Sequence, residues 1–193
     1  MKRRGIAQIL GVLSVVLLFL MLWVLLGQVR NKAIVEAIQN YDLAGVQSLK
    51  ARGASSDAKM DFLIAILKEN PAEVKQMLAA GLDVNACDVK GNTPLIYAVN
   101  GSTIQVIKIL IVHGAQVNAR GEDGTTALID AVHRNDAKIV KLLLDSGAEV
   151  NTRNDYQNTA LDFVDAGYGA RDAAIISQLL KRAGAKSYVW SDK

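Results

Sequence analysis

The sequence predicts an all-α fold, a solenoid of stacked helix pairs, preceded by one transmembrane helix. Residues 124–151 repeat the pattern of residues 91–118, so that equivalent positions lie 33 residues apart. Each copy has a helix-start signal, an apolar stripe and a closing glycine. A fixed period of this size is typical of stacked units, which expose a long surface instead of enclosing a catalytic cavity. The third observation is an uncharged apolar run over residues 5–29, which predicts the membrane span.

The apolar run near the N-terminus predicts a membrane anchor within residues 1–30. Residues 6–26 are dominated by Leu, Val and Ile, and about 20 such residues cross a hydrocarbon core about 30 Å thick. The run is longer than the roughly 7–15 residues of a cleaved signal peptide, and it lacks a small-x-small cleavage site near its end. No cysteine follows it, which excludes a lipoprotein signal. A cleaved signal and a buried helix are the alternatives to an uncleaved signal-anchor.

The charges beside the anchor predict its orientation. Lys2, Arg3 and Arg4 favour a cytoplasmic N-terminus, which places the repeats outside the cytoplasm. In a bacterium, this topology corresponds to an inner-membrane protein that faces the periplasm. Arg30 and Lys32 follow the run and reduce the charge asymmetry, so a cytoplasm-facing domain is the alternative.

The best-defined repeat begins with a recognisable helix start. Thr93 and its equivalent Thr126 are good N-cap residues, because a hydroxyl oxygen can accept a bond from an unpaired helix N–H. Pro94 follows at the first helical position, where its missing N–H costs nothing. Leu95 and Ala98 begin an apolar stripe with helical spacing. We therefore expect the first helix of this unit to begin directly after Thr93.

A second helix is expected from Ile104 to the residues before Gly114. It is apolar on more than one face, which is typical of a helix with neighbours on both sides. Gly114 and its equivalent Gly147 are of the residue type favoured just after a helix, in the left-handed conformation.

These residues together resemble the ankyrin repeat. Most of the matching positions recur one period later; in the first copy they are Asp88, Gly91, Thr93, Pro94, Leu95, Ala98, Gly114, Ala115, Val117 and Asn118. The resemblance implies helix pairs joined by β-turn or hairpin links. Gln157 stands where a turn glycine is expected, so the last turn should be less well defined. Gly121 stands where the family usually has aspartate.

Extending the register gives about five helix pairs within residues 31–186. The outer units are degenerate, as capping units must be because one face of each meets water. Asn70, Pro71 and Glu73 mark a helix start in the second unit, and the fifth closes late, at Gly184, after a Gly-rich insertion. The expected repeats are 31–56, 57–87, 88–120, 121–153 and 154–186, followed by a tail at 187–193.

Composition argues against nucleic acid as a partner. Five of the 22 basic residues lie in the first 32 positions, which leaves 17 basic and 19 acidic residues in the remainder. That remainder, at a net charge of −2, lacks the basic footprint of a nucleic-acid-binding domain. Cys87 is the single cysteine, so an internal disulfide is impossible.

The sequence contains no motif for catalysis, a cofactor, a metal or a small-molecule substrate. The two histidines, His113 and His133, have no cysteine or second histidine at metal-ligand spacing. No phosphate-binding glycine loop or nucleophile elbow is present. We therefore predict that the chain is not an enzyme and needs no cofactor.

The resemblance to ankyrin repeats implies a protein partner, bound by hairpin tips and first-helix positions along the concave side. Tyr97 and Phe163 align with Asp130, and two aromatic residues beside an acid would suit an interface. The alternative is that Phe163 belongs to the core, covered by the Gly-rich insertion. The candidate partner-binding residues are Val89, Lys90, Asn92, Tyr97, Asn100, Glu122, Asp123, Thr125, Asp130, His133, Arg134, Asp155, Tyr156, Asn158 and Phe163.

We therefore expect a membrane-tethered protein–protein interaction scaffold. The chain resembles bacterial periplasmic ankyrin proteins, which implies support of a stress-defence enzyme or neutralisation of a toxic protein. The alternatives are an envelope assembly factor that acts through its anchor helix, and a membrane adaptor that faces the cytoplasm.

Overall fold

The computed structural model describes residues 58–101, 103–165 and 172–186, with scattered positions between Val29 and Ala44. The expected membrane span, residues 6–26, lies outside the described residues, as do most of the first expected repeat and the tail at 187–193. None of the helices in the described part is both long and apolar enough to cross a membrane.

The described part of the chain contains four successive helix pairs, and most of the first of the five expected pairs lies outside the described residues. It has no β-strand beyond one isolated bridge between Arg120 and Thr126, beside a short 3-10 helix, η1 (Glu122–Gly124). The pairs are α3 (Ala58–Leu67) and α4 (Pro71–Ala79), α5 (Pro94–Gly101) and α6 (Ile104–Val112), α7 (Ala127–His133) and α8 (Ala137–Asp145), and α9 (Ala160–Asp165) and α10 (Ala173–Arg182).

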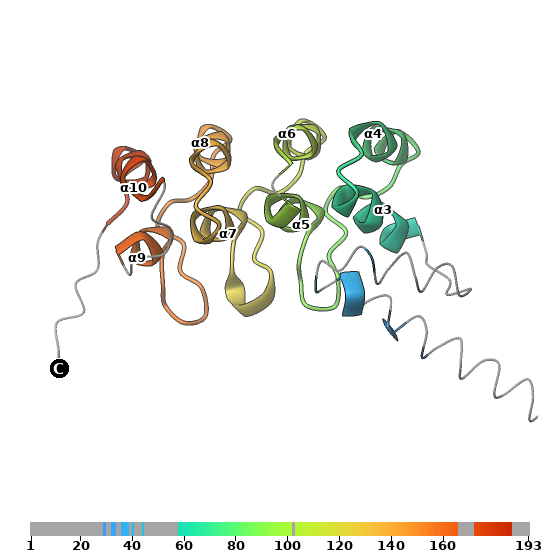
Figure 1. The fold of residues 1–193 in the computed structure, drawn as a ribbon, viewed down its shortest axis with the longest axis horizontal. Helices are drawn as coiled ribbons and strands as arrows, with labels where there is room; N and C mark the ends of the chain where they lie inside the picture. Colours follow the sequence, from blue (N-terminus) through green and yellow to red (C-terminus); the bar gives the residue numbers. More distant parts are fainter. Residues whose placement is uncertain are drawn as a thin grey trace, which may run out of the picture. The chain divides into compact units, whose positions relative to one another are not determined.

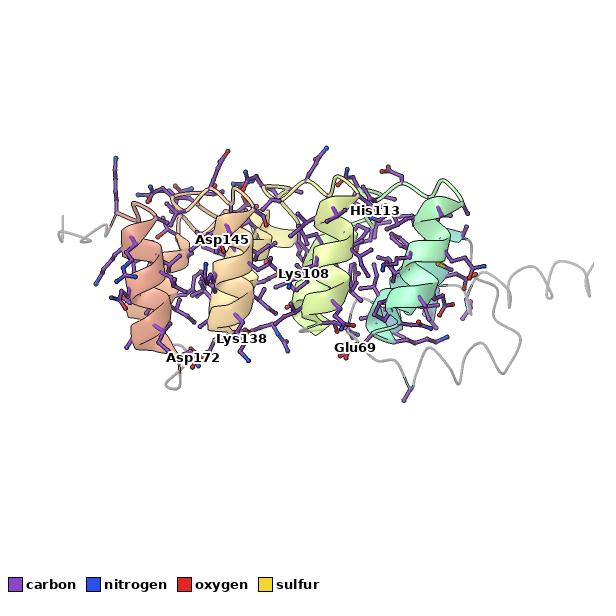
Figure 2. The ribbon with its side chains drawn as sticks, turned by 90° about the horizontal axis from the view of Figure 1, so that it is seen from above. Glu69, Lys108, His113, Lys138, Asp145 and Asp172 are labelled. Carbon is purple, nitrogen blue, oxygen red and sulfur yellow. The ribbon has the colours of Figure 1, made fainter. Side chains whose placement is uncertain are left out.

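The chain divides inside α3 into two compact units, and the second begins at Phe62. Within this second unit the helices form two layers (Figure 1). The first layer holds α5, α7 and α9 side by side, and the second layer holds α4, α6, α8 and α10. Hairpin loops extend from the first layer on the side away from the second. Figure 2 shows the second layer from above, its helices lying side by side.

The core lies between these layers, because the short first helices are apolar nearly all round. In α5 every residue from Pro94 to Val99 is buried, and α7 is buried from Ala127 to Ile129 and again at Ala131 and Val132. The second-layer helices bury only one face. Fully buried side chains that fill the space between the layers are Leu95, Ile107, Leu110, Leu128, Ile139, Leu143, Leu161 and Ile176.

The predicted helix starts are confirmed. The hydroxyl oxygen of Thr93 accepts from the N–H of Ile96, and that of Thr126 from Ile129, both at 3.4 Å. Asn70 caps α4 by accepting from the N–H of Glu73 at 3.3 Å, and its amide donates to the Glu73 carboxylate at 3.1 Å. Local chemistry therefore sets where each of these helices begins.

One asparagine in each repeat bonds to the next repeat. Asn85, Asn118 and Asn151 are 33 residues apart. Their amide nitrogens donate to the carbonyl oxygens of the next helix-ending glycines, at 3.2, 3.1 and 3.0 Å. Their amide oxygens accept a backbone N–H two residues beyond each glycine, at 2.8, 2.8 and 2.9 Å. This asparagine ladder fixes the spacing between neighbouring repeats through both atoms of each amide.

Replacing Asn118 with alanine should lower the free energy of unfolding by about 2 kcal/mol, because two hydrogen bonds of about 1 kcal/mol each are lost. Urea unfolding of the full-length protein in mild detergent, followed by circular dichroism, measures the change. The matched control is Gln116→Ala, which alters an exposed side chain and should cost under about 0.5 kcal/mol. Equal costs for the two variants would contradict a stabilising role for the ladder.

The three loops that precede α5, α7 and α9 contain the same turn. The first residue of each turn, Asp88, Gly121 or Asn154, donates its N–H to the carbonyl four residues later, at 3.0, 2.8 and 3.0 Å. The fourth residue of each turn has a positive φ, +85° at Gly91, +67° at Gly124 and +66° at Gln157. The expectation of a less well-defined last turn is therefore wrong: Gln157 adopts the glycine conformation, and its neighbours hold it there.

Gln157→Gly should stabilise the protein by about 1 kcal/mol, because a residue with a Cβ is strained in the left-handed region and glycine is not. The same urea unfolding measurement tests this change. Gln157→Ala is the control, since it shortens the exposed side chain and keeps the strained backbone. A similar gain from both variants would mean that the side chain, and not the backbone conformation, sets the cost.

Candidate functional site

The structure separates the candidate binding residues by exposure. Tyr97 is fully buried, and the remaining residues lie on the hairpin loops or on the first-layer helices with exposed or partly exposed side chains. The exposed ones are Val89, Lys90, Glu122, Asp123, His133, Arg134, Asp155 and Tyr156; the partly exposed ones are Asn92, Asn100, Thr125, Asp130, Asn158 and Phe163.

Tyr97 corrects one part of the predicted surface. Its side chain has no exposed area, and its hydroxyl donates to the Asp88 carboxylate at 2.8 Å. The same carboxylate accepts the backbone N–H of Asn92 at 2.8 Å, so Tyr97 supports the turn from inside the fold. The expected surface row of Tyr97, Asp130 and Phe163 is therefore not a row of exposed side chains.

Ion pairs connect the hairpin tips of neighbouring repeats. Lys90 pairs with Glu122 at 2.9 Å, and Arg120 pairs with Asp155 at 2.8 Å. The guanidinium of Arg120 also donates to the carbonyl oxygen of Arg153 at 2.6 Å. Exposed pairs of this kind contribute at most about 1 kcal/mol each. Their main effect is to hold adjacent tips in one arrangement.

A backbone hydrogen bond joins two of these tips directly. The N–H of Asp155 donates to the carbonyl oxygen of Asp123 at 2.8 Å. Gly124 leaves room for the ion pair beside this bond, because a Cβ there would meet the Arg120 guanidinium and the Asp155 carboxylate. Sequence reasoning missed Arg120, whose guanidinium bonds to residues 33 and 35 positions further along the chain.

Two large apolar side chains project from this bonded frame. Val89 is 88% exposed and Tyr156 is 65% exposed. The Tyr156 hydroxyl is hydrogen bonded to Asp123, and this bond, more than the surrounding negative charge, raises the pKa of Tyr156. The bond to Glu122 likewise raises the pKa of Lys90. Val89 and Tyr156 therefore lie on either side of the acids Glu122, Asp123 and Asp155, and these five residues define the tip surface.

Gly121 changes the middle hairpin in a specific way. The side chain of Asn92 occupies the space that a Cβ at Gly121 would need, and its oxygen accepts the N–H of Glu122 at 2.9 Å. In the preceding hairpin, the carboxylate of Asp88 accepts backbone N–H groups of its own turn. In the middle hairpin, the acceptor is a side chain of the preceding repeat, Asn92. The departure at Gly121 therefore creates a further bond between repeats.

Asp130 is a mostly buried carboxyl group in the first layer. Burial raises its pKa to about 6, and the Asn100 amide, His133 and Arg134 act in the opposite direction. The amide of Asn100 on α5 donates to the carboxylate at 3.1 Å. On the other side of α7, the ring of His133 meets that of Phe163 edge to face, with centroids 6.0 Å apart. The candidate residues of α5, α7 and α9 are therefore in contact across the repeats.

Comparison with known families agrees with this architecture. The family model for ankyrin repeats, in three copies, matches residues 62–154. These residues are ankyrin repeats. No curated protein is similar enough to the chain to count as a match. Ankyrin repeats are generally interaction modules, so the match suggests a protein–protein interaction role for these residues, and it indicates no catalytic family.

The raised pKa of Asp130 predicts that the ankyrin repeats lose stability as pH rises. The folded pKa of about 6 exceeds the ordinary value of 3.8, so folding favours the protonated form. The penalty is absent below about pH 4 and develops fully above about pH 6, where it amounts to about 3 kcal/mol.

Asp130→Asn should therefore be more stable than the unmodified protein above pH 6, with a flatter dependence of stability on pH. The new amide oxygen can still accept from Asn100. Urea unfolding at several pH values measures the effect, with Asp83→Asn as a control at an exposed carboxyl. An unchanged pH dependence in Asp130→Asn would show that this carboxyl ionises normally.

Proposed function

We propose that this protein is a membrane-tethered scaffold that binds a protein partner outside the cytoplasm. The uncharged run over residues 6–26 supports the tether, and the basic residues Lys2, Arg3 and Arg4 support the orientation. In a bacterium the ankyrin repeats then lie in the periplasm, where they bind a stress-defence enzyme or a toxic protein.

The observation that carries the binding function is the ankyrin-repeat match together with the tip surface. Val89 and Tyr156 are large apolar side chains in water, held on loops that are bonded to one another. Exposed apolar groups on a rigid frame bind with little loss of conformational freedom, and tyrosine is enriched at interface hot spots. The three acids between them favour a partner with two apolar pockets and a basic region between the pockets.

The first experiment tests the tether and the topology. A C-terminal tag is followed in intact cells whose outer barrier has been opened to protease, and membranes are fractionated in parallel. Digestion of a full-length, membrane-bound species is the expected result. Protection from protease would reverse the topology, and a shortened soluble band would replace the anchor with a cleaved signal.

The double variant Val89→Ser with Tyr156→Ser should weaken partner binding at least roughly 30-fold, the effect of losing a hot spot worth about 2 kcal/mol. Partners are first captured by crosslinking in envelope membranes, and affinity is then measured for the purified pair. Val89→Ile with Tyr156→Phe is the matched control, because it keeps the apolar surface. If both double variants bind as tightly as the unmodified protein, the tip surface is not the interface.

A further inference from the structure

The two sides of the repeat unit that begins at Phe62 carry opposite charge. The hairpin loops and first helices, over residues 82–101, 115–134 and 148–165, have nine acidic and four basic residues. The second layer has the reverse balance. Within its helices the acids are Glu73 and Asp145, and the basic residues are Lys75, Lys108, Lys138, Lys141, Lys181 and Arg182. Asp136 and Asp172 at the N-caps of α8 and α10 reduce this basic excess but do not reverse it. The net charge of the whole unit is near zero because an excess of acidic residues on the hairpin side offsets an excess of basic residues in the second layer.

The basic residues of the second layer form a row that follows the repeat. Lys75 on α4, Lys108 on α6 and Lys141 on α8 are 33 residues apart, and all three side chains are exposed. Lys141 pairs with Asp145 at 2.6 Å within its own helix. In Figure 2, Lys108 lies on the face of α6 that is turned to the viewer, with Lys138 near the start of α8.

Exposed apolar side chains accompany these charges. Val112 at the end of α6 is 82% exposed, and Ile175 in the first turn of α10 is 53% exposed. Basic residues interspersed with exposed aliphatic side chains are typical of surfaces that lie at a lipid headgroup layer. A domain attached to a membrane anchor is also held near that layer at a high effective concentration, so a weak contact is enough.

We propose that the second layer, α4, α6, α8 and α10, is a docking face for an anionic phospholipid surface. This proposal rests on the membrane tether of the proposed function. Lysine and arginine side chains contact the lipid phosphates, and Val112 and Ile175 enter the headgroup region. Because the hairpin loops lie on the opposite side of the unit, docking presents the tip surface to partners away from the membrane.

The test uses the full-length protein in nanodiscs and two alternative fluorophore positions. One is the native Cys87, exposed on the hairpin side. The other is a cysteine on α6, made as Gln105→Cys in a Cys87→Ser background, at an exposed position of the second layer. Energy transfer to labelled lipid headgroups compares the two positions in phosphatidylglycerol and phosphatidylcholine discs.

In phosphatidylglycerol discs the label on α6 should show the stronger transfer, and high salt should abolish the difference, because the Debye length falls to about 3 Å at 1 M. Lys108→Gln with Lys138→Gln should lower the ratio of docked to undocked protein roughly 30-fold, since each basic residue contributes about five-fold. The control, Arg134→Gln with Arg153→Gln, removes the same charge from the hairpin side and should leave the ratio unchanged.

Other outcomes overturn the proposal in distinguishable ways. Protein retained in discs with equal transfer from both positions excludes the docking face and leaves the tether intact. Protein that does not stay with discs of either lipid overturns the tether and the docking face together. Equal transfer combined with crosslinking of the α6 cysteine to an acidic protein in native membranes assigns the second layer to that protein.

Discussion

The stacking of this domain depends on one repeated contact, the asparagine amide that bridges each unit to the next. A solenoid unit cannot bury its apolar faces alone, so its stability comes from its interfaces with its neighbours. Apolar packing between helices fixes their separation only loosely, because it has no direction. Asn85, Asn118 and Asn151 add direction, since each uses a donor and an acceptor on one rigid amide. The helix-ending glycines provide the carbonyl groups at these positions.

The arrangement of the hairpin tips depends on the asparagine ladder. Once the repeats have a fixed spacing, the tips lie close enough for Arg120 to reach Asp155 and for the N–H of Asp155 to reach the carbonyl of Asp123. None of these exposed contacts is strong alone. Together they reduce the freedom of Val89 and Tyr156, and a partner therefore meets a surface that is already arranged.

The sequence predicted contacts within a repeat better than contacts between repeats. Thr93, Thr126, Pro94 and Asn70 act on their own helices, so their roles follow from local spacing. Tyr97 was misplaced because the partner of its buried hydroxyl, the Asp88 carboxylate, lies nine residues earlier, in the preceding turn. The bonds of Arg120 lie about one period away in the sequence, and no local pattern encodes them. The order of the turn at Gln157 was underestimated, because hydrogen bonds from Arg153 and Asn154 hold this turn without a glycine.

Equivalent positions in successive repeats are of two kinds: some hold the same residue, and others vary. The positions of Asn85, Thr93 and Gly114 keep the same residue in the next repeat, because each makes a contact on which the stacking depends. The position occupied by Tyr97, Asp130 and Phe163 does not: it holds a buried ring, a mostly buried carboxyl and a partly exposed ring. Of these three side chains, only the Asp130 carboxyl lowers the stability of the fold at neutral pH, because its burial disfavours the charged form. Variation at this position therefore sets the repeats apart from one another, whereas the positions of Asn85, Thr93 and Gly114 hold them together.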